Sequence, residues 1–567
     1  MWKKLLMWFK SDKGIFLLYA FGIIVLTLIS YQHLSQLFYM NDEWIALGNV
    51  LVNGIYANFS QYSILENLLG KGRPLTFLLS NLFYQYFTYN VTPFVVVAYT
   101  FHILNGLLLY ILVKKISKNR FVSAIAGIFF ITASVANQSM TWIPNITQDL
   151  TAVTFILVAQ LLLLIFSETK KKIYLFLSFF AAYIAFLFKD QFFYIFLWLP
   201  ILYILLSKTR LSLQVLFKKY WPLFVLAATV IIYKLIVLYG PDIISFKSNA
   251  INYWIKAFFN MLYYPLITLS QSFIPPEYMF KSAVKFLYFF YGHLTPYISN
   301  IDVISQNIIS DILSILLSLL ILITLLISYV TNKPQRKTLL IGMLFYVLSF
   351  STVAIYLDTR ATSYVESRYL YASMIGIGIF FAVILDTTKR ILFKIKLPRI
   401  ISIFVVSMIA IVYFGKHVTL IQRAVWRSTI NAQNETQVLK EFSKILPTLP
   451  PKSVIYLSGN NTYYGYANHP VPFQLNPGYI LMVWYYKSGF IPDDSLHVNR
   501  KLWTFGTQWY EESDGKAFGY YWDLKELQKV IDKKDIDTSQ ISGLYYDGNT
   551  RKLNNITDQV LLELNTQ

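Results

Sequence analysis

The chain has 567 residues, of which 56% are hydrophobic, 18% aromatic and only 14% charged, and its mean hydropathy is +0.50. Such a composition excludes an ordinary soluble protein and indicates an integral membrane protein that crosses the bilayer several times. The net charge of +20 comes from short basic clusters between apolar runs rather than from one continuous stripe, which argues against a nucleic-acid-binding protein.

Apolar runs of roughly 20 residues predict helices that cross a hydrocarbon layer about 30 Å thick, because lipid cannot satisfy backbone hydrogen-bonding groups. Pro74 to Phe87 is apolar but short, and we expect a re-entrant or interfacial helix there. The fold class is therefore an α-helical membrane protein with about eleven spans. We place these spans at residues 15–38, 92–113, 121–137, 148–166, 173–188, 191–206, 220–239, 303–330, 338–357, 369–386 and 400–415.

Basic clusters occur at every second connection between these spans, for example at Lys170 to Lys172 and around Lys389 to Arg399. The positive-inside rule then places the amino terminus and these connections in the cytoplasm. Residues 1–415 form the transmembrane domain in this interpretation, with two long external loops at 40–92 and 240–302. The tail, 416–567, lies outside the cytoplasm.

The tail changes composition and predicts a small α/β domain. A helix is expected over Thr429 to Leu446, with its basic and acidic residues on a solvated face. Three prolines follow, and Ser453 to Ser458 (SVIYLS) has the apolar, β-branched character of a strand.

Ionisable and amide side chains in or beside the spans are costly to place in a membrane, so their positions are informative. On the predicted topology they all fall on the external side, where they are expected to line one cavity at the outer membrane surface. They are Asp42, Glu43, Arg73, His102, Asn105, Asn137, Gln138, Trp142, Asp149, Lys189, Asp190, Lys234, Glu366, Arg368 and Tyr369.

Several of these residues also have a purely structural interpretation. His102 is then a hydrogen-bonded residue of helix packing, and Lys234 extends its ammonium group to the interface. The remaining structural interpretations are that Asp42 and Glu43 mark a span end, Arg73 binds a lipid headgroup, Lys189 and Asp190 neutralise each other in a tight loop, and Glu366 and Arg368 form an ordinary loop pair.

The order of several short motifs resembles a known family. These motifs are the acidic pair Asp42–Glu43 after the first span, GRPL at 72–75, HILN at 102–105, Trp142 seven residues before Asp149, FKD at 188–190 and ESRYLY at 366–371. Over approximately residues 1 to 415 the chain resembles the C-type integral-membrane glycosyltransferases, notably the protein O-mannosyltransferase-like branch and its bacterial relatives. It departs from that pattern at Ala136 to Gln138, where proline and histidine are usual, and at Asp190, where glutamate is usual.

This resemblance implies a polyprenyl-phosphate-linked sugar donor, an acceptor outside the cytoplasm and a site in contact with membrane lipid. Asp42 is then the base that takes the acceptor proton, with Glu43 as its partner. Arg368 is the first choice for the donor phosphate, with Arg73, Lys189 and Lys234 as further candidates. The residues expected to contact substrate are His102, Asn137, Gln138, Trp142, Asp149, Asp190, Glu366 and Tyr369.

No cofactor is expected. The chain has no cysteine, which excludes thiolate ligands, and it has no DxD-like cluster beyond Asp42 and Glu43, so no obligatory metal is expected.

Two other function classes stay open at this point. A polymerase or ligase of cell-surface polysaccharide has a large external loop with arginines, whereas 240–302 contains four lysines and no arginine. A transporter of a lipid-linked sugar needs polar groups near the midplane and broken helices in matching halves, which the sequence does not display.

Overall fold

The computed structural model describes most of the chain, in two compact units. The described residues are 11–207 apart from 58, 60, 61, 69 and 71; 221, 225, 228, 229 and 232; 248–291; 301–356; and 365–566 apart from 466, 467, 498 and 499. The first unit comprises Met1–Gln32, Leu68–Thr76 and Val96–Arg423, and the second comprises His33–Asn67, Phe77–Val95 and Ala424–Gln567.

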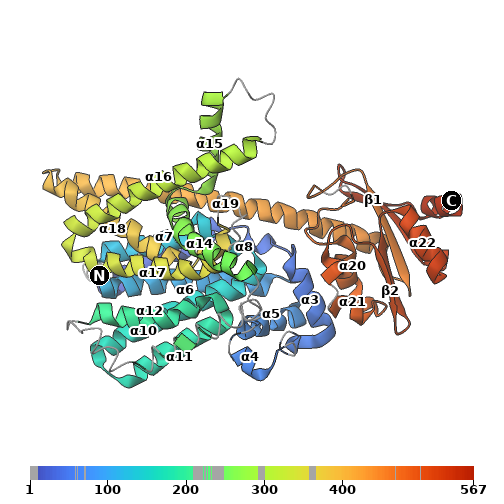
Figure 1. The fold of residues 1–567 in the computed structure, drawn as a ribbon, viewed down its shortest axis with the longest axis horizontal. Coiled ribbons are helices and arrows are strands. Elements are labelled where there is room, and N and C mark those ends of the chain that lie inside the picture. The colour runs from blue at the N-terminus through green and yellow to red at the C-terminus, as the bar shows by residue number, and fades with distance from the viewer. Residues whose placement is uncertain are drawn as a thin grey trace, which may run out of the picture. The chain divides into compact units, whose positions relative to one another are not determined.

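Long apolar helices build the first unit (Figure 1). Within the described residues, six helical segments are long and apolar enough to cross a membrane, namely Asp12–Gln36, Thr92–Ser117, Ile143–Thr169, Asn307–Thr331, Lys333–Val353 and Arg399–Ile445. The chain is therefore a helical membrane protein, while the count of eleven spans stays a prediction. The predicted span 220–239 falls almost wholly outside the described residues.

The helices of this unit largely follow the expected ranges. Their bounds are α2 Asp12–Ser30, α6 Thr92–Ser117, α7 Arg120–Thr132, α10 Thr151–Thr169, α11 Lys172–Phe188, α12 Ile195–Leu206, α14 Ser248–Phe273, α15 Pro276–Tyr291, α16 Ile301–Thr331, α17 Arg336–Tyr356, α18 Met374–Lys394 and α19 Arg399–Ile445. The interfacial segment expected at Pro74–Phe87 is helix α5.

Short helical turns connect many of the long helices. They are η1 Leu34–Gln36, η3 Ser134–Ala136, α8 Gln138–Thr141, α9 Ile143–Asn145, η4 Ile146–Leu150, η5 Asp190–Tyr194, η7 Lys333–Gln335 and η8 Ser367–Leu370. Of these, η4 is a π-helix, a form that is often found at functional sites.

Small residues allow the long helices to approach closely. A Cβ added to Gly376 of α18 would lie 2.6 Å from the carbonyl oxygen of Gly342 in α17, so only glycine fits there. Close backbone approach of this kind is a main source of helix association in lipid. Lipid tails are as apolar as the helix surfaces, so no hydrophobic force drives the helices together. Leucine, isoleucine and phenylalanine side chains on the outer faces of α2, α16 and α19 remain exposed, as expected for surfaces in contact with lipid.

The second unit contains a five-stranded sheet in the order β2-β3-β1-β4-β5. The strands are β1 Ser453–Gly459, β2 Trp509–Ser513, β3 Lys516–Tyr521, β4 Ile541–Asp547 and β5 Lys552–Asn555. The central strand β1 runs parallel to β3 and β4, and the outer strands β2 and β5 run antiparallel to their neighbours. The strand expected at Ser453 to Ser458 is confirmed as β1.

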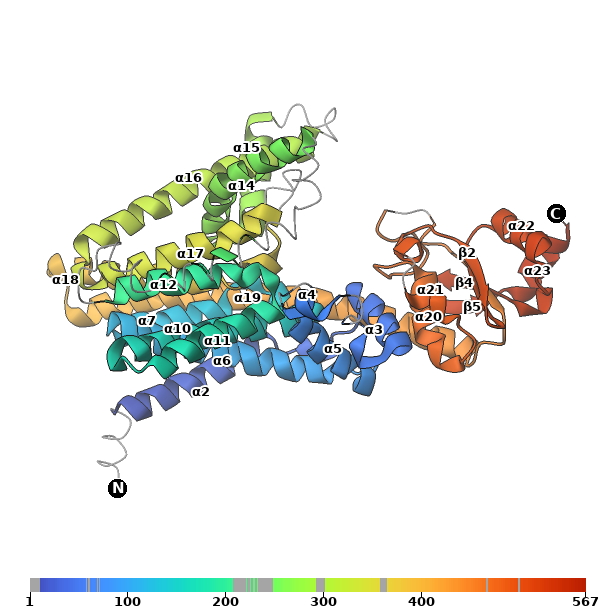
Figure 2. The ribbon, with the colours of Figure 1, turned by 60° about the horizontal axis from the view of Figure 1, so that its bottom comes forward.

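Helices cover both faces of this sheet (Figure 2). Helices α22 (Leu524–Lys534) and α23 (Thr557–Thr566) enclose a core that includes Val454, Leu527 and Val560. Helices α20 (Pro477–Tyr485) and α21 (Asp493–His497) contact the strands β3 and β2. The tail therefore contains the small α/β domain that its composition predicts.

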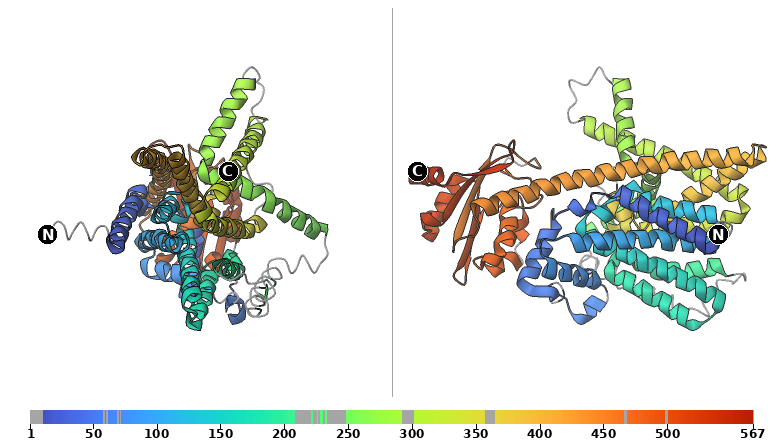
Figure 3. Two further views of the ribbon diagram at one scale, coloured as in Figure 1. Left: turned by 90° about the vertical axis from the view of Figure 1, so that its left-hand side faces the viewer. Right: turned by 180° about the vertical axis from the view of Figure 1, so that it is seen from behind.

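Helix α19 is 47 residues long and unbroken (Figure 3). We predicted two separate elements here, a span at 400–415 and a helix over Thr429 to Leu446. The charged residues between them, Lys416, Arg423 and Arg427, lower the hydropathy of the segment but are all good helix formers, so the helix continues through them.

The second unit also contains the first external loop, which forms α3 (Asp42–Asn53), η2 (Gly54–Tyr56) and α4 (Ile64–Leu68). Helix α3 packs on α20 at Gly48, where an added Cβ would lie 2.6 Å from the Tyr479 hydroxyl and 3.1 Å from Val483. Nearby, the Tyr89 ring packs against Trp484 in a tilted arrangement with ring centroids 4.5 Å apart, and its hydroxyl donates a hydrogen bond of 2.9 Å to the carbonyl oxygen of Val483.

Replacing Gly48 by valine is expected to destabilise this unit by about 1–3 kcal/mol, because the branched side chain must displace Tyr479 or α20. Thermal unfolding of the purified protein, followed by tryptophan fluorescence, measures the change. Gly415→Val on α19 is the matched control, since nothing lies within 4 Å of a Cβ at that glycine. Equal unfolding midpoints for the two variants would show that α3 does not depend on this contact.

Candidate functional site

Arg73 sits on a strained turn in the first unit and reaches two partners from other elements. Its φ of 52° lies in the left-handed region, which a non-glycine residue adopts only where the surroundings hold it. The side-chain Nε donates to Asp190 Oδ1 at 3.0 Å, and Nη1 donates to Gln148 Oε1 at 2.9 Å. The GRPL turn is thereby joined to η4 and to the start of η5.

Lys189 is buried and pairs with a residue distant in sequence. Only 3% of Lys189 is exposed, and its ammonium group forms an ion pair with Asp149, which is 1% exposed. Ser139 donates a further hydrogen bond of 3.1 Å to the other carboxylate oxygen of Asp149. The interpretation that Lys189 and Asp190 neutralise each other is therefore wrong. Lys189 pairs with Asp149, and Asp190 pairs with Arg73.

Three cations lie near one another around Lys189. Burial lowers the pKa of Lys189, the ion pair with Asp149 raises it, and the charges of Arg73 and Arg368 lower it further. Among the described residues, each cation forms an ion pair with a carboxylate: Arg73 with Asp190, Lys189 with Asp149, and Arg368 with Glu366. These three described ion pairs together carry no net charge.

Arg368 has the arrangement best suited to exchanging its partner for a ligand. Its guanidinium lies 4.3 Å from the centroid of the Trp142 ring and 5.0 Å from that of Tyr369, and its Nε pairs with Glu366 at 2.6 Å. Glu366 is the most exposed carboxylate of the cluster, with 47% of its side chain accessible. Among the described residues, no hydrogen bond occupies either Nη atom of Arg368, so a planar fork remains to bind an oxyanion.

The amides predicted to contact substrate hold the turn that carries Arg368. Ser367 Oγ donates to Asn137 Oδ1 at 3.1 Å, the backbone N–H of Gln138 donates to Ser367 Oγ at 3.2 Å, and the backbone N–H of Arg368 donates to Gln138 Oε1 at 3.2 Å. Asn137, Gln138 and Ser367 also line a cavity of about 250 Å³, together with Gln271 and Glu277.

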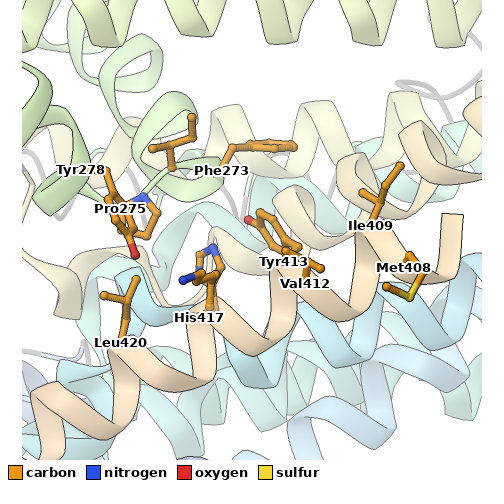
Figure 4. A pocket seen from close by; sticks show the side chains of 11 residues that line it. Phe273, Pro275, Tyr278, Met408, Ile409, Val412, Tyr413, His417 and Leu420 are labelled. Atoms are coloured by element: carbon orange, nitrogen blue, oxygen red, sulfur yellow. The ribbon is translucent and has the colours of Figure 1, made fainter. Parts of the chain in front are cut away.

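An apolar groove of about 570 Å³ adjoins this polar cavity, and the walls of both include Pro275 and Leu420 (Figure 4). Side chains of α19, among them Val412 and Tyr413, face Phe273 and Pro275 across the groove. A groove of this character among membrane helices suits a hydrocarbon chain.

His102 is buried between helices and hydrogen-bonded within the bundle. The ring is 2% exposed; Nδ1 is 2.8 Å from the Tyr371 hydroxyl and Nε2 is 3.1 Å from the carbonyl oxygen of Ile131. Asn105 joins the same network by donating to the Tyr371 hydroxyl at 3.2 Å. Both ring nitrogens are engaged within the helical bundle, which favours the packing interpretation of His102.

Asp42 and Glu43 belong to the second unit, where they occupy the first turn of α3. Asp42 is exposed, whereas Glu43 is 1% exposed and turns back onto its own helix start. Glu43 Oε2 accepts hydrogen bonds from the backbone N–H groups of Asn41 at 2.8 Å and Met40 at 3.3 Å. Of the pair, Asp42 is therefore the one accessible to a ligand.

The remaining predicted residue, Lys234, lies outside the described residues. Sequence reasoning missed Gln148, Ser139 and Ser367, which are polar neighbours of the predicted positions and carry no charge to distinguish them. In the part of the chain that the structure describes, no group of three or more His, Asp or Glu side chains is placed to hold a metal ion.

Comparison of the sequence with protein-family models and with curated proteins finds no match.

Proposed function

We propose that the protein is a membrane glycosyltransferase that moves a sugar from a polyprenyl-phosphate donor to an acceptor outside the cytoplasm. The cluster of Arg73, Lys189 and Arg368 carries the proposal, because the three cations gather where apolar helices end. An apolar groove lies beside the cavity that includes Ser367, the residue before Arg368. A lipid with a phosphate headgroup has both a hydrocarbon chain that suits the groove and a negative charge that suits the cations.

The proposed reaction joins the acceptor oxygen to the anomeric carbon of the sugar and breaks the bond from that carbon to the phosphate oxygen. The acceptor proton passes to the carboxylate of Asp42. The leaving polyprenyl phosphate gains negative charge, which arginine and lysine stabilise electrostatically. Arg368 is the proposed main contact of that phosphate, since no described residue hydrogen-bonds its Nη atoms and its guanidinium lies over the Trp142 and Tyr369 rings.

The same proposal assigns the amino terminus to the cytoplasm and residues 416–567 to the outside of the cell membrane. It also assigns the residues that contact substrate, namely Asn137, Gln138, Trp142, Asp149, Asp190, Glu366 and Tyr369. The polar cavity beside Ser367 is the proposed place of the sugar.

The test uses the purified full-length protein in lipid nanodiscs with a panel of polyprenyl-phosphate hexoses. The expected result is release of polyprenyl phosphate, measured by chromatography and mass spectrometry, that depends on an added extract of cell-surface acceptors. Comparing the surface glycans of strains with and without the gene then identifies the acceptor. A protein that releases no polyprenyl phosphate from any donor is not such a transferase, and donor movement across vesicles without release would identify a transporter instead.

A further inference from the structure

The polar cavity of about 250 Å³ has one charged side chain among the described residues that line it. Helix α14 ends at Phe273, and Pro275 and Pro276 follow, since proline does not continue a helix. Pro276 is instead the first residue of α15, a position that suits its fixed φ. This turn places the next residue, Glu277, in the first turn of α15 and in the wall of the cavity.

No described protein group balances the charge of Glu277. Its side chain forms no ion pair or hydrogen bond with any described residue. The carboxylates of Asp149, Asp190 and Glu366, by contrast, each pair with a cation. A negative charge is favourable at the start of a helix, which accounts for a carboxylate at this position. Its oxygens remain available to a ligand that enters the cavity.

Two amide side chains of the cavity wall supply hydrogen-bond donors. Asn137 Oδ1 accepts from Ser367 Oγ at 3.1 Å, and Gln138 Oε1 accepts from the backbone N–H of Arg368 at 3.2 Å. These bonds identify the oxygen end of each amide, and therefore also the nitrogen end. No described residue accepts a hydrogen bond from Asn137 Nδ2 or Gln138 Nε2, so both NH₂ groups are left as donors.

A ligand that fits this cavity must accept hydrogen bonds from the amides and donate one to a carboxylate. Hydroxyl groups do both. The cavity is smaller than the roughly 300–1,000 Å³ of sites for drug-sized ligands, so it suits one small polar unit rather than a chain of units. A carboxylate on that unit would meet the charge of Glu277 and be repelled by it.

We propose that Glu277 is a specificity-determining residue of this cavity, which takes a sugar without a carboxylate and excludes a uronic acid. The proposal rests on the proposed function in taking this sugar to be the one carried by the polyprenyl-phosphate donor. Charge then sorts the two parts of the donor head. The phosphate binds at Arg368, and the sugar, uncharged or bearing an amino group, lies beside Ser367 and Glu277.

The first test measures binding and needs no turnover. The probes are the methyl glycosides of glucose, mannose and galactose and of the three corresponding uronic acids, in which a carboxylate replaces the terminal CH₂OH. Saturation-transfer NMR with the full-length protein in lipid nanodiscs measures their affinities. At least one neutral glycoside is expected to bind at least about tenfold more tightly than its uronic acid at low salt. Salt screens the repulsion, so this preference is expected to shrink as the salt concentration rises.

Two substitutions assign the preference to Glu277. Glu277→Gln keeps the size of the side chain without its charge, and the preference is expected to fall below about threefold. Glu277→Lys is expected to reverse it. The control is Glu441→Gln, at a partly exposed glutamate of α19 outside the described cavity wall, and it is expected to keep the wild-type preference. Because Glu277 is exposed, unfolding temperatures close to that of the wild type are expected for all three variants.

Three results overturn the proposal: binding of no neutral glycoside, equal binding of neutral and acidic glycosides by the wild type, or an unchanged preference in Glu277→Gln. Turnover separates it from the proposed function. Glu277→Gln is expected to release polyprenyl phosphate from uronic acid donors about tenfold faster than the wild type does. A protein with the charge preference in binding but no release keeps the cavity assignment and is not a transferase. Release that Glu277→Gln does not change with either kind of donor keeps the transferase and removes the role of Glu277.

Discussion

Replacing Asp42 by asparagine is expected to lower sugar transfer by about 10²–10⁴-fold, the typical contribution of a positioned general base. The amide keeps the size and hydrogen-bonding shape of the carboxylate but cannot take a proton from the acceptor hydroxyl. Asp42 is exposed on the first turn of α3, and an amide of the same size is expected to leave the fold unchanged. The measurement is the rate of polyprenyl phosphate release by the purified variant at saturating donor.

Two further variants make this result specific. Glu66→Gln removes a carboxylate from the same external loop, where the Glu66 side chain accepts hydrogen bonds from Ser63, and it is expected to transfer sugar at the wild-type rate. Asp42→Glu keeps a base but moves it, and is expected to retain part of the activity. Wild-type turnover in Asp42→Asn would remove Asp42 from the role of base.

The sequence predicts the long elements of the fold well because their signals are local. Apolar runs give the helices α6, α16 and α17 close to their bounds, whereas α2 ends at Ser30, eight residues before the predicted end of the first span. The apolar, β-branched run SVIYLS gives β1. The helix α19 shows the limit of this reasoning. Hydropathy reports what surrounds a helix and not whether the helix continues, so the change from apolar to polar residues after Gly415 predicts an end that the structure does not have.

The partners within the candidate site could not be predicted, because they depend on how distant segments meet. Lys189 and Asp190 are neighbours in sequence, yet their side chains diverge to Asp149 and Arg73. The backbone of Lys189 is extended and leads directly into η5, which accounts for the divergence. Glu435 of α19 is the same case in the second unit: its charge predicts a solvated position, yet the packing around the helix leaves it 0% exposed.

Charge clusters in the sequence were nevertheless informative about the site. More than 100 residues separate Arg73, Lys189 and Arg368 from one another in the sequence. Each is a candidate site residue because an ionisable group in or beside a membrane span is costly and is rarely kept without a function. The charges of Arg73 and Arg368 lie close enough to Lys189 to lower its pKa.

Replacing Lys189 by methionine is expected to lower the stability of the first unit by about 3–5 kcal/mol, the usual effect of removing one member of a buried ion pair. The side chains of Lys189 and Asp149 are 4% and 1% exposed, so the substitution leaves a carboxylate in a dry environment with Ser139 as its remaining described partner. Thermal unfolding in lipid nanodiscs measures the loss. Lys115→Met is the matched control, because its partner Glu168 is largely exposed and such pairs contribute less than about 1 kcal/mol.

The double variant Lys189→Met/Asp149→Leu separates stability from function. Replacing both members by apolar side chains removes the unpaired charge, so most of the lost stability is expected to return. Sugar transfer is not expected to return with it, because one of the three cations proposed to stabilise the leaving phosphate is still missing. A double variant that regains both stability and activity would make Lys189 a purely structural residue, and a single variant no less stable than Lys115→Met would show that the buried pair contributes nothing to the fold. The expected pattern, a stable protein with impaired release of polyprenyl phosphate, requires that Lys189 act on the ligand as well as on Asp149.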